Sequence, residues 1–170
     1  FASIISRYQD PDGDLGISDE GWEIAAKFLG NAHNIADGED AVGSVINGTY
    51  PMDEHWASGV LTEQKDRDYK FQIMTPDIGE PYVVESLAIS AGTKKYDTCV
   101  AFLNWLGSSD VQLDWSNNYG TIPCQKEALA QVSDDIKELM ETLKPQDLDW
   151  SFIAENVDAW GEKAELEYVQ

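Results

Sequence analysis

The chain has 170 residues, a hydrophobic content of 42% and an aromatic complement of 6 Trp, 7 Tyr and 5 Phe. This composition excludes a disordered chain and is enough for one domain with a sizeable core, or for parts of two lobes. The 32 acidic and 11 basic residues give a net charge of −21. Such a charge repels nucleic-acid phosphates and anionic lipid headgroups, and it mildly favours cationic ligands.

The two ends and the cysteines give few further constraints. No apolar run approaches the roughly 18 residues that a membrane-spanning helix needs. The sequence begins with Phe1 and shows no signal peptide, so we expect a processed or truncated piece. Cys99 and Cys124 lie 25 positions apart without a CxxC motif, which argues against zinc and leaves a disulfide open.

The first part of the chain predicts short helices around a polar loop. A short helix is expected over residues 1–8, followed by a loop over residues 10–17 that is rich in Asp and Gly. Ser18 is a good N-cap, and the apolar stripe of the helix that it begins ends at Gly30. A second short helix is expected over residues 40–46.

The remainder of the chain alternates strands and helices. Strands are predicted over residues 50–54, 69–74 and 83–90. The last of these is β-branched and almost continuously apolar, so it is expected to be buried on both faces. Helices are predicted from His55, over the apolar stripe 96–106, after the Ser-Ser-Asp cap at 108–110 and in the tail from Trp150. Strands separated by helices predict an α/β fold.

The acidic loop before the Ser18 helix resembles a calcium-binding loop. Asp10, Asp12 and Asp14 occupy alternate positions, as calcium ligands do in an EF-hand. An EF-hand loop also needs Gly at its sixth position and an acidic residue at its twelfth, and here those positions hold Leu15 and Gly21. A turn leading into a capped helix is the interpretation that the pattern favours.

The sequence lacks the motifs of common enzyme classes. His33 and His55 are its only histidines, and neither belongs to an HExxH pair. No G-x-S-x-G elbow and no glycine-rich phosphate loop is present. Pairs of carboxylates are plentiful in so acidic a chain and do not by themselves indicate acid–base catalysis. We therefore predict no catalytic residue, no metal, no cofactor and a chain that is not an enzyme.

Two segments carry residue types suited to holding a ligand. In residues 54–59 a predicted strand gives way to a helix, and Trp56 offers a flat face for stacking or cation–π contact there. In residues 79–86, Glu85 is a lone carboxylate inside an apolar strand. A buried carboxylate needs a partner, which is either a local Lys, Arg or backbone amide, or a bound cation.

Three motifs follow one another in the second half of the chain. They are Leu87-Ala88-Ile89, Cys99-x-x-Phe102-x-x-Trp105-Leu106-x-Ser108-x-x-x-Gln112 and Gly120-x-x-Pro123. In this order and spacing they resemble the C-terminal half of bacterial ABC-transporter substrate-binding proteins. The group concerned binds spermidine or putrescine, ferric iron, thiamine and phosphonates. The tail at 146–168, rich in Trp and charge, is similar to the C-terminal helix of that group.

The resemblance implies a two-lobed α/β protein of the type II periplasmic-binding-protein kind, of which this chain is a fragment. Residues 1–81 would belong to the second lobe. Residues 82–119 would contain the hinge crossing and a segment of the first lobe, and residues 120–170 would return to the second lobe and form the C-terminal helices. The N-terminal half of such a protein would then lie outside this chain.

The resemblance also implies the residues that contact the ligand. The candidates are His55, Trp56, Ser58, Tyr82 and Glu85. Trp56 and Ser58 match the position where the second lobe meets the ligand, and Glu85 matches an acidic residue with which polyamine binders hold an ammonium group. Val83 stands where those binders have a stacking Trp, and the tyrosine pair of ferric-iron binders is absent at His55-Trp56.

The function that this resemblance implies is the substrate-binding component of an ABC importer. Its partners would be a small solute, with a cationic amine as one candidate, and the permease subunits, but not nucleic acid. Its location would be extracytoplasmic, as a periplasmic protein or a cell-surface lipoprotein, and the isolated chain is expected to self-associate. The six Trp leave open an autonomous carbohydrate- or protein-binding module, and a hydrolase would need two carboxyls facing each other in a cleft.

Overall fold

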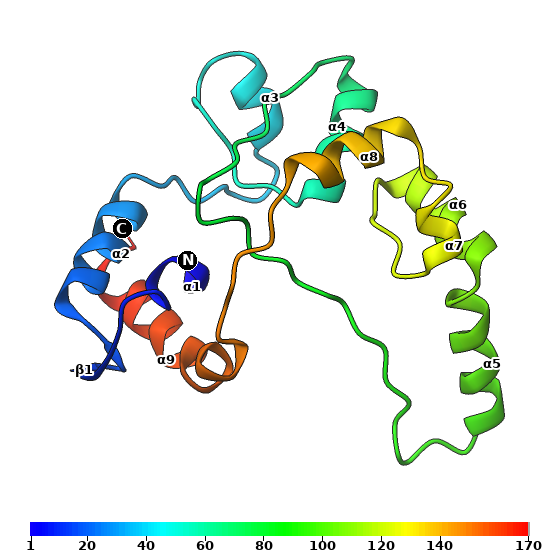
Figure 1. The fold of residues 1–170 in the computed structure, drawn as a ribbon. Helices are drawn as coiled ribbons and strands as arrows, with labels where there is room; N and C mark the ends of the chain where they lie inside the picture. Colours follow the sequence, from blue (N-terminus) through cyan, green and yellow to red (C-terminus); the bar gives the residue numbers. More distant parts are fainter. Residues whose placement is uncertain (170) are drawn as a thin grey trace. The chain divides into compact units, whose positions relative to one another are not determined.

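The computed structural model describes residues 1–169 and consists mainly of helices (Figure 1). Its residues form two compact units. Unit 1 comprises residues 1–39 together with the chain from residue 146 onward, and unit 2 comprises residues 40–145. None of the helices within residues 1–169 is long and apolar enough to cross a membrane.

Unit 1 is a small helical unit in which α1, α2 and α9 pack against one another (Figure 1). Its elements are α1 (Ala2–Ile5), β1 (Gln9–Asp14), α2 (Asp19–Gly30) and α9 (Trp150–Glu167). Its buried core consists of Ile5, Ile17, Trp22, Ala25, Ile153 and Trp160. The apolar stripes predicted for the second and the last of its helices therefore face a common core.

The start of α2 follows the predicted capping pattern. The Ser18 hydroxyl accepts a hydrogen bond from the Gly21 N–H at 3.3 Å, and Asp19 and Glu20 lie in the first turn, where the helix dipole favours negative charge. The helix ends at Gly30, as predicted. In contrast, the first helix covers only residues 2–5 rather than the expected 1–8.

The acidic segment expected to be a loop forms a tight return instead. Strand β1 doubles back so that Gln9 and Asp14 pair with Ile17. Two indoles hold this return in place, because Trp22 Nε1 donates to the Asp14 carbonyl at 2.9 Å and Trp160 Nε1 donates to the Leu15 carbonyl at 3.0 Å. Burying an indole requires a partner for its N–H, and here the partners are backbone carbonyls of the return.

Unit 2 is built around helix α6, which contacts α4, α5 and α7. Its elements are α3 (Ala41–Ile46), α4 (Ala57–Arg67), α5 (Tyr96–Leu106), α6 (Ser109–Tyr119), α7 (Lys126–Leu129) and α8 (Asp134–Thr142). The buried apolar side chains of this unit are few and are Ala128, Val132, Ile136 and Leu139. The helix starts predicted after Asp40, His55 and Ser108 are thus all confirmed to within two residues.

Helices α3 and α4 are joined by one charged cluster. Asp40 caps α3 by accepting from the Gly43 N–H at 2.9 Å, and Arg67 at the end of α4 donates to both Asp40 oxygens at 2.8 and 2.9 Å. The side-chain hydrogen bonds from Arg67 lower the pKa of Asp40 below its usual value. Arg67 also pairs with Glu63 on its own helix. This cluster fixes the N-terminus of α3 beside the C-terminus of α4.

The predicted strands of unit 2 are not formed. No strand forms in residues 50–54, 69–74 or 83–90. Within residues 1–169, β1 is the only strand, and the other β pairings are isolated bridges. Val84 and Leu87, expected to be buried on both faces, are 70% and 60% exposed. A strand needs a neighbour for its backbone groups, and no strand of unit 2 provides one. The helices of the predicted α/β fold are present without their sheet.

Trp160 is the side chain on which unit 1 depends most. It is fully buried, it packs edge-on against Phe152 with ring centroids 5.3 Å apart, and it holds the Leu15 carbonyl. We expect Trp160→Ala to lower the free energy of unfolding of unit 1 by about 3–5 kcal/mol in urea titrations. Trp150→Ala, on the same helix but 49% exposed, should cost less than about 1 kcal/mol. Equal losses for the two variants would contradict this assignment.

Candidate ligand-binding site

Trp56 is the N-cap residue of α4 and presents its indole to solvent. Its backbone is extended, with φ −65° and ψ 132°, and its carbonyl accepts the Val60 N–H at 3.1 Å. The side chain makes no capping hydrogen bond and is 70% exposed. An exposed Trp of this kind offers a flat surface for stacking against a ligand or for cation–π contact with it. The predicted strand-to-helix position of Trp56 is confirmed only on its helical side.

His55 is held against the first turn of α4 by two neighbours. Its Nδ1 lies 3.2 Å from the Asp53 carboxylate. Its ring covers Gly59 so closely that a Cβ on Gly59 would lie 2.6 Å from His55 Nε2. Both side chains of the His55–Asp53 pair remain partly exposed. The imidazole is therefore oriented by its neighbours while its side chain stays 33% exposed.

Ser58 lies where α4 meets the end of α6. Gly120, the C-cap residue of α6, has φ +68° and approaches so closely that a Cβ there would lie 2.5 Å from the Ser58 carbonyl oxygen. The same turn is closed by the buried Ser116 hydroxyl, which donates to the Thr121 carbonyl at 2.6 Å. The first turn of α4 is thus packed on the Gly120 turn, which fixes Ser58 and its neighbour Trp56.

The second candidate segment begins at a pairing with the end of α8. The Glu80 N–H donates to the Lys144 carbonyl at 2.7 Å, and the Lys144 N–H donates to Glu80 Oε2 at 2.8 Å. Tyr82 is half-buried, and burial, followed by the nearby Glu80 charge, raises the pKa of its phenol. Glu85 is exposed rather than enclosed in an apolar strand. The prediction of a buried Glu85 is wrong because the strand that would have buried it is not formed.

The candidate residues are near one another only along the sequence: His55, Trp56 and Ser58 lie at the start of α4, and Tyr82 and Glu85 lie on the connection after Glu80. Among residues 1–169, no hydrogen bond or ion pair links Tyr82 or Glu85 to the start of α4. Sequence reasoning missed Glu80, whose only signal was a carboxylate between Gly79 and Pro81 in a turn. It identified Gly120 as part of a motif without a role, and the Ser58 contact now supplies that role.

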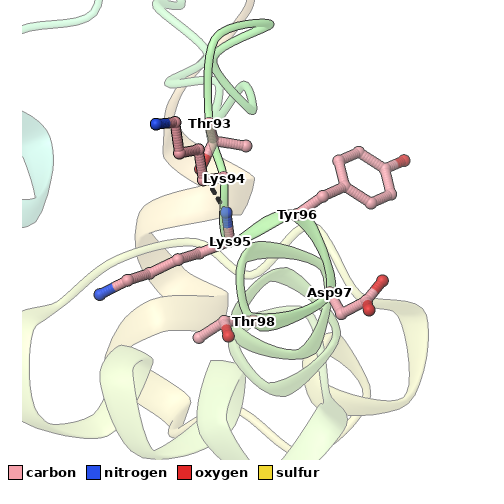
Figure 2. Close-up of a pocket in the computed structure, with 6 residues that line it drawn as sticks. All are labelled: Thr93, Lys94, Lys95, Tyr96, Asp97 and Thr98. Carbon is pink, nitrogen blue, oxygen red and sulfur yellow. Dashed lines mark hydrogen bonds between the residues drawn. The ribbon is translucent and has the colours of Figure 1, made fainter.

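Two hollows of unit 2 lie away from these residues. The larger, about 360 Å³, lies at the start of α5 and is lined by Thr93 to Thr98, a single stretch of chain whose side chains point in different directions (Figure 2). The smaller, about 170 Å³, is lined by polar side chains of α4, α6 and α8, among them Lys65, Asp66 and Asp135. None of the five candidate residues lines either hollow.

The acidic loop and the cysteines are not arranged for a metal in the described part of the chain. Within residues 1–169, no group of three or more His, Cys, Asp or Glu side chains is placed to hold a metal ion. Asp10 instead accepts the Asp12 N–H at 3.0 Å within the β1 return. Cys99 and Cys124 are both free thiols, so the disulfide left open by the sequence is not formed.

Gly120 provides a direct test of how the first turn of α4 is positioned. We expect Gly120→Ala to destabilise unit 2 by about 2–4 kcal/mol, because the new Cβ adds a clash with Ser58 to the strain of a positive φ. Gly48 also has a positive φ, +79°, but open space around it. Gly48→Ala should therefore cost only about 1–2 kcal/mol in the same urea titration. Similar costs for both variants would show that the Ser58 contact does not limit the packing.

Comparisons with known proteins identify the family of this chain. Residues 2–144 match the family described as "Bacterial extracellular solute-binding protein". The chain is 34% identical over 170 residues to the "Probable ABC transporter periplasmic-binding protein y4fP" of Sinorhizobium fredii (strain NBRC 101917 / NGR234). That match covers 100% of this chain and 47% of the relative, so the chain spans about half the length of the curated relative. No solved structure matches the chain. Because the family match covers most of its residues, the chain belongs to the bacterial extracellular solute-binding proteins.

Proposed function

We propose that the chain is part of the substrate-binding component of an ABC importer, which captures a small solute between two lobes and delivers it to the permease. The observation that carries this proposal is the 34% identity along the whole chain to a relative named as an ABC transporter periplasmic-binding protein. The family match over residues 2–144 supports it independently. In this role the protein performs no chemistry and works outside the cytoplasm, as a periplasmic protein or a cell-surface lipoprotein.

The residues that we assign to the solute lie in two exposed positions of unit 2. Trp56, with His55 and Ser58 beside it, forms an aromatic surface at the start of α4. Tyr82 and Glu85 lie on the segment that follows the Glu80–Lys144 pairing. An exposed indole and an exposed carboxylate suit a positively charged solute that also has a flat or apolar part.

A cationic amine is the solute class that this chemistry favours. The chain carries a net charge of −21, which attracts cations and raises their concentration near the surface. Glu85 is then the group that pairs with the ammonium, and Trp56 stacks on the adjoining methylene groups. In the polyamine binders of the group that this chain resembles, a Trp occupies the position of Val83. We therefore assign the aromatic contact to Trp56 and Tyr82.

The lobe boundaries predicted from the resemblance belong to the same proposal. Residues 82–119 would contribute to the first lobe, and residues 1–81 and 120–170 to the second. Segment 83–105 supports this assignment, because six of its large apolar side chains are exposed. Those side chains are Val83, Val84, Leu87, Tyr96, Phe102 and Trp105. A surface of this kind is typical of one that another protein segment covers.

The ligand assignment is tested by thermal shift on the full-length gene product with polyamines, thiamine, ferric iron, phosphonates and sugars. An amine should raise the melting temperature, and Glu85→Gln should abolish that rise because the ammonium loses its charge partner. Trp56→Ala should weaken binding by roughly tenfold, as expected for the loss of about 1–2 kcal/mol of stacking or cation–π energy. Glu138→Gln removes the exposed carboxylate that pairs with Lys70 and is the matched control. An unchanged shift in Glu85→Gln would remove this residue from the site, and a shift with sugars alone would favour a carbohydrate-binding module.

The exposed apolar segment makes a second prediction for the isolated 170-residue chain. We expect it to self-associate, because Val84, Leu87 and Trp105 leave apolar area in water that a second copy can cover. Sedimentation velocity between about 5 and 200 µM should show oligomers that increase with concentration, and Leu87→Asp should reduce them. The exposed Leu166 lies in unit 1, outside segment 83–105, so Leu166→Asp is the control. A monomer at every concentration would contradict the prediction.

A further inference from the structure

Glu80 joins two parts of unit 2 that lie 64 residues apart in the sequence. Its N–H donates to the Lys144 carbonyl, and its side-chain Oε2 accepts the Lys144 N–H in return. Residue 80 also forms a parallel bridge with Pro145, the last residue of unit 2. One residue therefore satisfies both backbone groups of Lys144, one through its main chain and one through its carboxylate.

The turn before Glu80 holds its carboxylate in a position that costs folding free energy. Gly79 is buried with φ +82° and donates its N–H to the Pro76 carbonyl at 2.9 Å, so a tight turn delivers Glu80 to its partner. The second oxygen of Glu80, Oε1, is fully buried and has no hydrogen-bond donor within residues 1–169. A buried carboxylate oxygen without a donor destabilises the folded state. An apolar residue would avoid that cost but would lose the hydrogen bond to the Lys144 N–H, so the carboxylate holds the pairing while leaving its second oxygen unsatisfied.

The chain beyond Glu80 has little else to hold it. After the Glu80–Lys144 pair, the next backbone–backbone hydrogen bond runs from the Thr93 N–H to the Ser90 carbonyl at 3.1 Å, just before α5. Figure 1 shows the intervening stretch as a long connection without helix or strand. The Glu80 contact is thus the fixed point from which this connection starts, and Tyr82 follows it by only two residues.

We propose that Glu80 is a positioning residue of the candidate ligand site: its carboxylate fixes the start of segment 81–89 and so holds Tyr82 where a solute meets it. This inference rests on the proposed function for its link to a ligand, but not for its structural part. Glu80 does not touch the solute, because its free oxygen is inaccessible and its other oxygen is occupied by Lys144. It acts through the segment that it anchors.

The Tyr82 phenol reports on this positioning. Burial is the main cause of its raised pKa, and the Glu80 charge is the second. Glu80→Gln removes the charge but retains an amide oxygen that accepts the Lys144 N–H, so Tyr82 keeps its burial. Glu80→Ala removes the acceptor as well and releases the segment. The two variants therefore separate an effect of charge from an effect of position.

The experiment is a ¹³C-tyrosine NMR titration of the 170-residue chain, at a concentration at which sedimentation velocity shows a monomer, with the Tyr82 signal assigned from Tyr82→Phe. We expect the Tyr82 pKa to fall slightly in Glu80→Gln and to fall to the value of an exposed tyrosine in Glu80→Ala. Amide exchange at Lys144 should be roughly three- to tenfold faster in Glu80→Ala and little changed in Glu80→Gln. Equal falls in both variants, or none in either, would overturn the proposal. Glu138→Gln is the control, and circular dichroism across the titration checks the fold.

Two further arms keep the outcome decisive. If Glu80→Ala does not fold, Glu80→Asp takes its place, because a carboxylate shortened by one methylene keeps the charge but does not reach the Lys144 N–H. In the full-length gene product, Glu80→Ala should lower the affinity for the amine that raises the melting temperature most by roughly tenfold. Glu80→Gln should bind that amine nearly as tightly as the native protein does. If no compound binds the native protein, the proposed function fails, and the Tyr82 titration still decides the role of Glu80.

Discussion

A β-strand forms only beside another strand that takes up its backbone hydrogen bonds, and this constraint decides the structure of unit 2. Its helices satisfy their own backbone groups and are present with their caps in place. Its extended segments find no neighbour apart from the single Glu80–Pro145 bridge. The connection from residue 81 to α5 therefore exposes the apolar side chains that a sheet would have covered. The exposed apolar surface of this connection and its single anchor at Glu80 both follow from the absence of a neighbouring strand.

Local signals predicted α2, α4, α5 and α6 because a helix is specified by nearby residues, whereas α7 and α8 were not predicted. Ser18 and Gly30 bound α2 as expected, and Gly107 ends α5. The strands could not be predicted in the same way, because their formation depends on a pairing partner distant in sequence. The β-branched run of residues 83–90 has strand propensity, but propensity alone does not supply the missing hydrogen bonds. The return at β1 was missed for the converse reason, since Trp22 and Trp160 stabilise it from outside the loop.

In the candidate site, too, the features set by nearby residues were predictable and those set by distant contacts were not. The position of Trp56 at a helix start was predictable from a few neighbouring residues, and its exposure is consistent with a binding role. The exposure of Glu85 was not predictable, because it follows from the absence of the strand that was expected to bury it. Glu80 and Gly120 owe their roles to Lys144 and Ser58, which lie 64 and 62 positions away in the sequence. No pattern within a short window indicates contacts of that range.

The exposure of the candidate residues also limits where affinity for a solute can arise. A carboxylate in water gains only about 1 kcal/mol from a cation at contact distance, whereas the same pair with water excluded gains several times more. Glu85 and Trp56 are both exposed, so in this arrangement they attract a cation without holding it tightly. In the proposed importer component, the strength of binding then comes from the closure that removes water from these side chains. Fixing Tyr82 beforehand through Glu80 lowers the ordering cost of that closure, which is why an anchor outside the site affects affinity inside it.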